Sequence, residues 1–93
     1  MSDELRELNE VLDLIRAERD RQNAKWGAVQ NNAIPEWGII LAEECGEVIK
    51  AMNEAWFRTG NPQEVIDELV QCAAVCVSII QHRGMWAGGS NNE

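Results

Sequence analysis

Three glutamates between residues 41 and 48 have the type and spacing expected of a site for a hard cation. The segment lies in the middle of a predicted helix, and a helix turns by about 100° per residue. Glu44 therefore projects onto the apolar arc of this helix, Glu47 onto the edge of the arc, and Glu43 outside it. Glu44 and Glu47 are neighbours on one face because they are three residues apart. Two like charges on a buried face are costly unless a cation meets them, and a divalent metal ion is the simplest such cation.

A third inward carboxylate is expected on the next helix, where Glu68 projects among apolar residues. Because only a short turn separates the two helices, they should pack antiparallel and could share one metal site. Carboxylate oxygens with almost no histidine favour Mg²⁺, with Mn²⁺ as a substitute, over zinc or copper.

The sequence predicts an all-α fold with three main helices. They run from about Ser2 to Asn23, from Pro35 to Phe57 and from Pro62 to His82, with proline, asparagine and glycine at the positions that suit helix ends. Residues 1–83 should form one antiparallel helical bundle, completed to a four-helix type by a second copy, and residues 84–93 a flexible tail.

The connection between the first two helices, from Lys25 to Ile34, is about ten residues long and has no hydrophobic period. Most helix–helix connections in bundles are shorter. We therefore expect this loop to cover a site.

The inward line of the first helix changes from apolar to polar along its length. Its apolar part consists of Leu5, Leu8, Leu12 and Ile15. Its polar continuation is Arg19 and Gln22, and two interpretations stay open. Either the helix leaves the core there and these side chains are solvated, or they face a polar cavity.

Length and charge limit the class of protein. A chain of 93 residues in three helices has a thin core, so a homodimer or homotetramer is expected. The net charge of −8 argues against a nucleic-acid polymer as partner, since such binding depends on clustered lysine and arginine.

No apolar run approaches the roughly 20 residues of a membrane span, and the acidic N-terminus is unlike a signal peptide. We expect a cytoplasmic protein that does not bind a membrane.

The cysteines are Cys45, Cys72 and Cys76, and their odd number argues against a disulfide framework. A zinc site of Cys72 and Cys76 with His82 is a weaker alternative, because structural zinc sites need four well-placed ligands. We interpret the cysteines as small core residues.

The acidic motif resembles that of the all-α nucleoside triphosphate pyrophosphohydrolases of the MazG type. The pattern of that family is Glu-x-x-Glu, a spacer, and Glu-x-x-Asp. Glu44 and Glu47 match the first half and Glu68 the first position of the second half, whereas Gln71 stands where the family usually has aspartate. A rival alignment that uses Glu64 and Asp67 is set aside, because Asp67 projects to the polar side of its helix.

The stretch from residue 18 to residue 27 also resembles the segment that precedes the motif in small bacterial and phage-type members of this family. The resemblance extends over about residues 16–80. It implies that water attacks the α-phosphorus of a nucleoside or deoxynucleoside triphosphate and releases the monophosphate and pyrophosphate, as in nucleotide-pool house-cleaning.

The resemblance also implies roles for individual residues. Glu44, Glu47 and Glu68 would hold the metal, Gln71 could offer a neutral oxygen, and Glu43 could orient or deprotonate the water. The candidates for substrate contact share a cationic, amide or aromatic side chain: Arg19, Lys25 and Lys50 for phosphate, Gln22 for a polar contact, and Trp26, Trp37 and Trp56 for stacking on the base.

Three interpretations without catalysis compete with this one. Acidic pairs on helices are usually solvated. A buried salt bridge from Glu44 to Arg19 or Lys50 would need no metal. The whole chain could also be a helical dimerisation or regulatory module.

Overall fold

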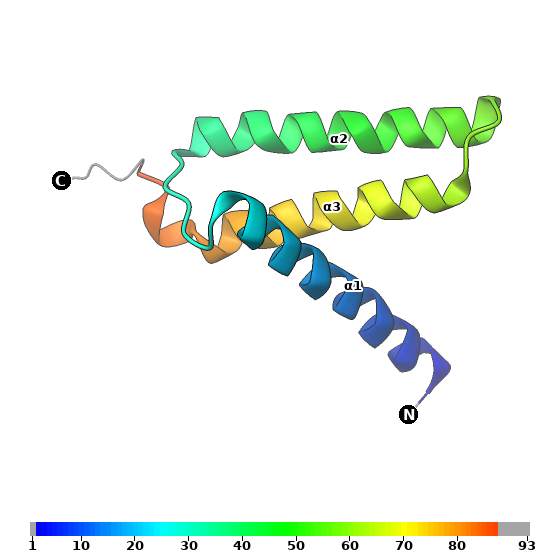
Figure 1. The fold of residues 1–93 in the computed structure, drawn as a ribbon, viewed down its shortest axis with the longest axis horizontal. Coiled ribbons are helices and arrows are strands. Elements are labelled where there is room, and N and C mark those ends of the chain that lie inside the picture. Colours follow the sequence, from blue (N-terminus) through cyan, green and yellow to red (C-terminus); the bar gives the residue numbers. More distant parts are fainter. Residues whose placement is uncertain (1, 88–93) are drawn as a thin grey trace.

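Three α-helices make up most of residues 2–87, which are the residues described by the computed structural model (Figure 1). α1 spans Asp3–Trp26, α2 spans Ile34–Phe57 and α3 spans Pro62–Gln81, and a short 3-10 helix, η1, spans Arg83–Met85. The predicted all-α class is confirmed. Within residues 2–87 no strand forms, and the β-type contact is an isolated bridge between Ala33 and Ala87.

Local capping chemistry explains where the helices begin. The Ser2 hydroxyl accepts a hydrogen bond from the Leu5 N–H at 3.2 Å, and the Asn61 side chain accepts one from the Gln63 N–H at 2.8 Å. At the start of α2, the Glu36 carboxylate instead accepts from the Ala33 N–H at 2.7 Å. These bonds satisfy backbone donors that a helix leaves unpaired in its first turn.

α1 continues three residues beyond its predicted end at Asn23. It stops at Gly27, whose φ of 92° is a left-handed conformation that favours glycine and whose N–H donates to the Asn23 carbonyl at 2.8 Å. The connecting loop is correspondingly shorter than expected, with Gly27 to Ala33 between the two helices.

A tight turn makes α2 and α3 antiparallel, as predicted (Figure 1). The Gly60 N–H donates to the Glu54 carbonyl at 3.1 Å, which folds the chain back onto the end of α2. A Cβ atom at residue 60 would lie 2.7 Å from the Glu54 carbonyl carbon, so this close approach requires glycine.

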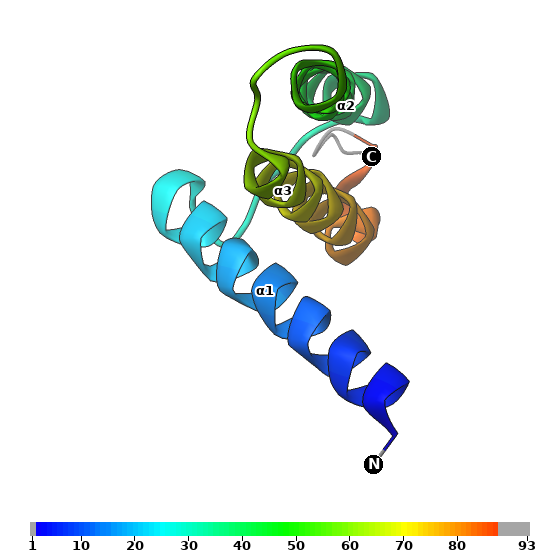
Figure 2. The ribbon, with the colours of Figure 1, turned by 90° about the vertical axis from the view of Figure 1, so that its right-hand side faces the viewer.

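α3 packs against both α2 and α1, whereas the N-terminal half of α1 diverges from the helical pair (Figures 1 and 2). As a result, the apolar line of α1 does not reach the core of this chain. Leu5, Leu8 and Leu12 are exposed, and Ile15 is half-buried. The buried apolar residues are few: Trp37, Val48, Ala51, Ala74 and Val75. The expectation of a thin core is therefore met.

The buried face of α3 differs from the one that its hydrophobic pattern favours. Ala74, Val75 and Ser78 are buried, while Leu69 and Ile80 on the main apolar arc are exposed. Ser78 is buried although the helical projection puts it on the same polar side as Asp67, because small side chains here let α3 fit between two neighbours. Within residues 2–87, these exposed apolar side chains of α3 are not covered by another element.

The C-terminal segment is described up to Ala87. Residues 83–85 form η1, and the Trp86 indole N–H donates to the Ile79 carbonyl at 3.0 Å, so this tryptophan docks on α3. Residues 88–93 of the predicted flexible tail lie outside the described part of the chain. In residues 2–87, no helix combines the length and the apolar character that a membrane crossing requires.

Candidate functional site

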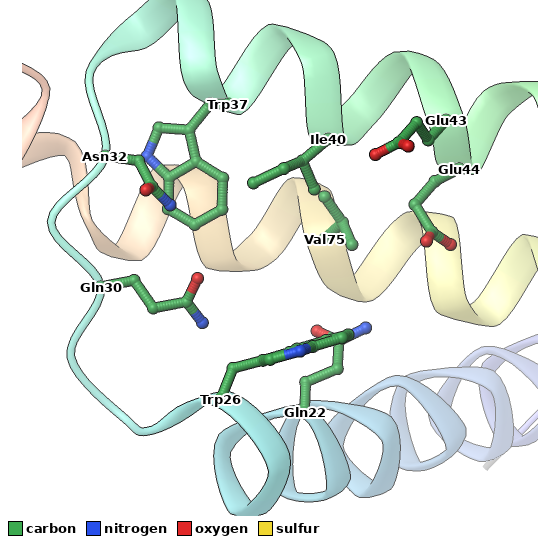
Figure 3. Close-up of a pocket in the computed structure, with 9 residues that line it drawn as sticks. All are labelled: Gln22, Trp26, Gln30, Asn32, Trp37, Ile40, Glu43, Glu44 and Val75. Atoms are coloured by element: carbon green, nitrogen blue, oxygen red, sulfur yellow. The ribbon is translucent and has the colours of Figure 1, made fainter.

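A cavity of about 370 Å³ lies between α1, α2 and the loop that connects them, with one contribution from α3 (Figure 3). Figure 3 shows Trp26 on the α1 side and Glu44 on the facing α2 side, with the loop residues at one end. The lining residues are Gln22, Trp26, Gln30, Asn32, Trp37, Ile40, Glu43, Glu44 and Val75. The cavity thus combines two indoles, three amides and two carboxylates, which suits a planar polar ligand with an attached charged group.

Glu44 is the most unusual group in this cavity. Its Oε1 atom is buried and has no hydrogen-bond partner within residues 2–87. Burial raises the pKa of the Glu44 carboxyl, and the negative charges of Glu68, Glu18, Glu47 and Glu43 raise this pKa further. An unpartnered carboxylate crowded by other carboxylates is the electrostatic setting that a bound cation would relieve.

The other predicted metal ligands surround Glu44 without converging on it. Glu68 and Gln71 on α3 are half-buried, and Glu47 on α2 is exposed. Glu43, which was predicted to orient the water, is exposed as well. Within residues 2–87, no three histidine, cysteine, aspartate or glutamate side chains are close enough to hold a metal ion. The donor set fits Mg²⁺ in chemistry, because it consists of three carboxylates and the amide oxygen of Gln71, but holding an ion would require these side chains to turn toward Glu44.

Glu18 is a member of this acidic cluster that the sequence pattern did not indicate. Its side chain is only 11% exposed, and it accepts a hydrogen bond from Arg21 Nε at 2.8 Å, which lowers the pKa of the Glu18 carboxyl. The available signal was helical spacing, since Glu18 stands one turn before Gln22 on the same face of α1.

Arg19 and Gln22 lie in a polar interior, which decides between the two interpretations of the first helix. Arg19 is 7% exposed and Gln22 is 3% exposed, so the solvated interpretation is wrong. Arg19 donates to Gln81 at 3.1 Å, to Gln22 at 3.1 Å and to Asn23 at 2.9 Å. Gln22 in turn donates to Glu18 at 3.2 Å and to the Gln71 carbonyl at 3.4 Å.

This network joins α1 to α3 and leaves Glu44 without a salt bridge to Arg19. Three nitrogens of the Arg19 guanidinium are each used within the protein, so a phosphate would have to displace one of these bonds. The salt-bridge alternative for Glu44 therefore has no support at Arg19. The role of Arg19 as a phosphate ligand stays a prediction.

The two tryptophans of the cavity differ in burial. Trp37 is 4% exposed, its ring centroid lies 5.8 Å from that of His82, and its Nε1 has no partner within residues 2–87. Trp26 is 52% exposed, and the Lys25 ammonium lies 4.9 Å from its ring centroid. Trp26 is therefore better placed to stack on a ligand, with Lys25 beside it as a cation.

The loop was expected to cover a site, and it supplies Gln30 and Asn32 to the cavity. The His82 ring helps to hold this loop, because its Nε2 lies 3.1 Å from the Ala28 carbonyl and its Nδ1 lies 2.7 Å from the Ser78 carbonyl. Within residues 2–87 no group of three metal-binding side chains includes His82, so the zinc alternative has no support.

Lys50 and Trp56 lie away from the cavity. Lys50 shares a separate surface hollow with Gly46, and Trp56 is 82% exposed near the far end of α2. A Cβ atom at Gly46 would meet nothing outside its own helix within 4 Å, so no other element of residues 2–87 approaches this glycine closely. The predicted contacts of Lys50 and Trp56 with substrate stay predictions.

Without metal, Glu44 should make the fold less stable as the pH rises. Its pKa in the folded protein is raised above the ordinary value of 4.5. The stabilisation by its proton is therefore complete below about pH 4.5 and is lost as the pH rises through the folded pKa. Glu44→Gln, measured in EDTA at pH 7 by circular dichroism, should melt above the wild type by about 4–8 °C, which corresponds to about 1 kcal/mol. The difference should shrink toward pH 4.5. A variant that melts below the wild type at both pH values would contradict this expectation.

Comparisons of this chain with protein-family models, with curated proteins and with solved structures gave no match. The fold and the cavity define an all-α protein with an acidic, aromatic-lined site. An activity can therefore be assigned only from the residues of this site.

Proposed function

We propose that this chain is a magnesium-dependent pyrophosphohydrolase of nucleoside or deoxynucleoside triphosphates. The observation that carries the proposal is the buried, unpartnered Oε1 of Glu44, surrounded by negative charge at the wall of a cavity that also contains an accessible indole. A carboxylate is kept in such a place at a cost to stability, which is characteristic of functional sites.

The acidic end of the cavity would hold the metal. Glu44, Glu47 and Glu68 would be its carboxylate ligands, and Gln71, which is half-buried beside Cys72 on α3, could add a neutral oxygen. When bound, Mg²⁺ would neutralise phosphate charge and favour ionisation of a water molecule. Glu43 is exposed and also lines the cavity, so its carboxylate would be free to take a proton from the attacking water.

The other end of the cavity would bind the nucleoside. Trp26 would stack on the base, and the Gln30 and Asn32 amides would exchange hydrogen bonds with its polar edge. The Lys25 ammonium, which lies over the Trp26 ring, could turn to a phosphate oxygen. The reaction would break the bond between the α- and β-phosphates and release a monophosphate and pyrophosphate, in keeping with a house-cleaning role.

A second candidate, a helical dimerisation or regulatory module, is favoured by the exposed apolar surface. Leu5 and Leu8 on α1, Trp56 and Phe57 on α2 and Ile80 on α3 are at least 49% exposed. Such a surface on a chain with so few buried residues suggests that a second copy covers it. Both candidates predict a homodimer or homotetramer, so self-association cannot separate them.

Product analysis separates the two candidates. The purified chain is incubated with Mg²⁺ and each of the ordinary and damaged triphosphates, and pyrophosphate and orthophosphate are measured separately. The enzyme should release pyrophosphate with at least one substrate and stop when EDTA is added. Release of no pyrophosphate from any substrate, together with a melting temperature that Mg²⁺ and Mn²⁺ leave unchanged, would favour the module.

A further inference from the structure

Cys45 and Cys72 form a close pair across the interface of α2 and α3. Their Sγ atoms lie 4.0 Å apart, and the two residues are 27 positions apart in the chain. Cys45 is exposed and Cys72 is half-buried, so the pair is open to solvent from one side. The expectation of small core residues is wrong for Cys45 and for Cys76, which is also exposed.

We propose that Cys45 and Cys72 are an oxidation site, at which the two thiols form a disulfide that fastens α2 to α3. A disulfide needs its sulfur atoms about 2 Å apart, so the two Sγ atoms must approach each other by about 2 Å. Rotation of the two side chains, with a small shift of the neighbouring helices, would bring the two Sγ atoms to this distance. The inference rests on the position of the two thiols and stands independently of the proposed activity.

Exchange with a small-molecule disulfide such as oxidised glutathione accounts for all atoms and electrons. The thiolate of the exposed Cys45 attacks one sulfur of the small disulfide, forming a mixed disulfide and releasing one small thiolate. The Cys72 thiol gives its proton to water and attacks the Cys45 sulfur, and the second small thiolate leaves. The cysteine pair is oxidised by two electrons, and the small disulfide is reduced to two thiols.

The disulfide would change how the helical pair responds to heat. The bond would close a loop that contains the turn between the two helices, and loops of this length are stabilised substantially when they are cross-linked. We expect the melting temperature to rise by about 10 °C after oxidation and to return to its original value in dithiothreitol. The bond would also fix α2 relative to α3 beside Glu44, the residue that precedes Cys45.

The full chain is oxidised with oxidised glutathione and examined by intact mass spectrometry, peptide mapping and thermal unfolding. The wild type should lose about 2 Da, retain one free thiol and yield a Cys45–Cys72 cross-linked peptide. Cys76→Ser is the matched control and should form the same Cys45–Cys72 disulfide. Cys45→Ser should show no rise in melting temperature after oxidation.

The proposal would be overturned by glutathione adducts that remain without the mass loss. A cross-link that involves Cys76 or joins two chains would overturn it as well. Peptide mapping of the wild type gives this answer even if a variant does not fold.

Discussion

Replacing Glu44 with glutamine should lower magnesium-dependent pyrophosphate release by at least about 100-fold. The substitution keeps the size of the side chain and removes the charge whose Oε1 is buried without a partner. Glutamine leaves only a neutral oxygen toward the cation, so the cluster binds the metal and its phosphates less strongly. The same change removes repulsion from Glu68, Glu18 and Glu47, so the melting temperature in EDTA should rise. Activity should therefore fall while stability increases.

The opposite movement of activity and stability distinguishes this prediction from simple damage to the fold. Initial rates are measured with the best substrate of the triphosphate screen, beside circular dichroism of each variant. Glu10→Gln is the matched control, since Glu10 is exposed on α1, and it should retain the wild-type rate. A Glu44→Gln variant with a near wild-type rate would exclude Glu44 from the catalytic site.

Arg19→Met should destabilise the fold strongly, with a loss of about 3 kcal/mol and a fall in melting temperature of about 12–24 °C. Methionine fills a similar volume but leaves the partners of the guanidinium, Gln22, Asn23 and Gln81, without their donor. Because the bond to Gln81 joins α1 to α3, its loss should also free the C-terminal half of α1, which forms one wall of the cavity.

Arg16→Met provides the control for charge and helix propensity. Arg16 is exposed on the same helix and pairs with Asp13 at 2.9 Å, so its replacement should change stability by less than about 1 kcal/mol. Thermal unfolding of the two variants is compared under one condition. If Arg19→Met melts within a few degrees of Arg16→Met, the buried network does not hold α1 in place.

Helix boundaries were predictable wherever the determining chemistry is local. Asn61 and Pro62 fix the start of α3 as expected, and α2 ends at Phe57 as expected. The end of α1 was predicted three residues early: the helix continues to Trp26, and Gly27 with its positive φ is the residue that stops it.

Burial along α1 was not predictable from hydrophobicity, because tertiary contacts reverse it. The leucines near the N-terminus are exposed, since that half of the helix diverges from the other elements of residues 2–87, whereas Arg19 and Gln22 are buried against α3. A periodic pattern shows which residues share a face, but it does not show whether a helix extends past the element that it packs on.

The candidate site was predictable in its acidic part and less so elsewhere. Glu44 and Glu68 were selected because their charges interrupt apolar arcs, and both are half-buried. Glu18 was missed because the sequence pattern indicates a polar, solvent-facing side of the helix at this position. Gln30 and Asn32 were missed because a loop without a hydrophobic period does not show where its side chains point. Their contributions depend on how α1 and the loop fold over α2.

Binding of Mn²⁺ to the full chain tests most directly whether the glutamate cluster holds a hard cation. The free ion is followed by its electron paramagnetic resonance signal, which weakens when the ion binds to protein. We predict that the wild type takes up Mn²⁺ and that Mg²⁺ competes. Glu44→Gln and Glu68→Gln should each weaken the affinity by at least about tenfold, and Glu10→Gln should leave it unchanged. If the wild type takes up no Mn²⁺, or if Glu44→Gln and Glu68→Gln bind it as the wild type does, the cluster is not a metal site.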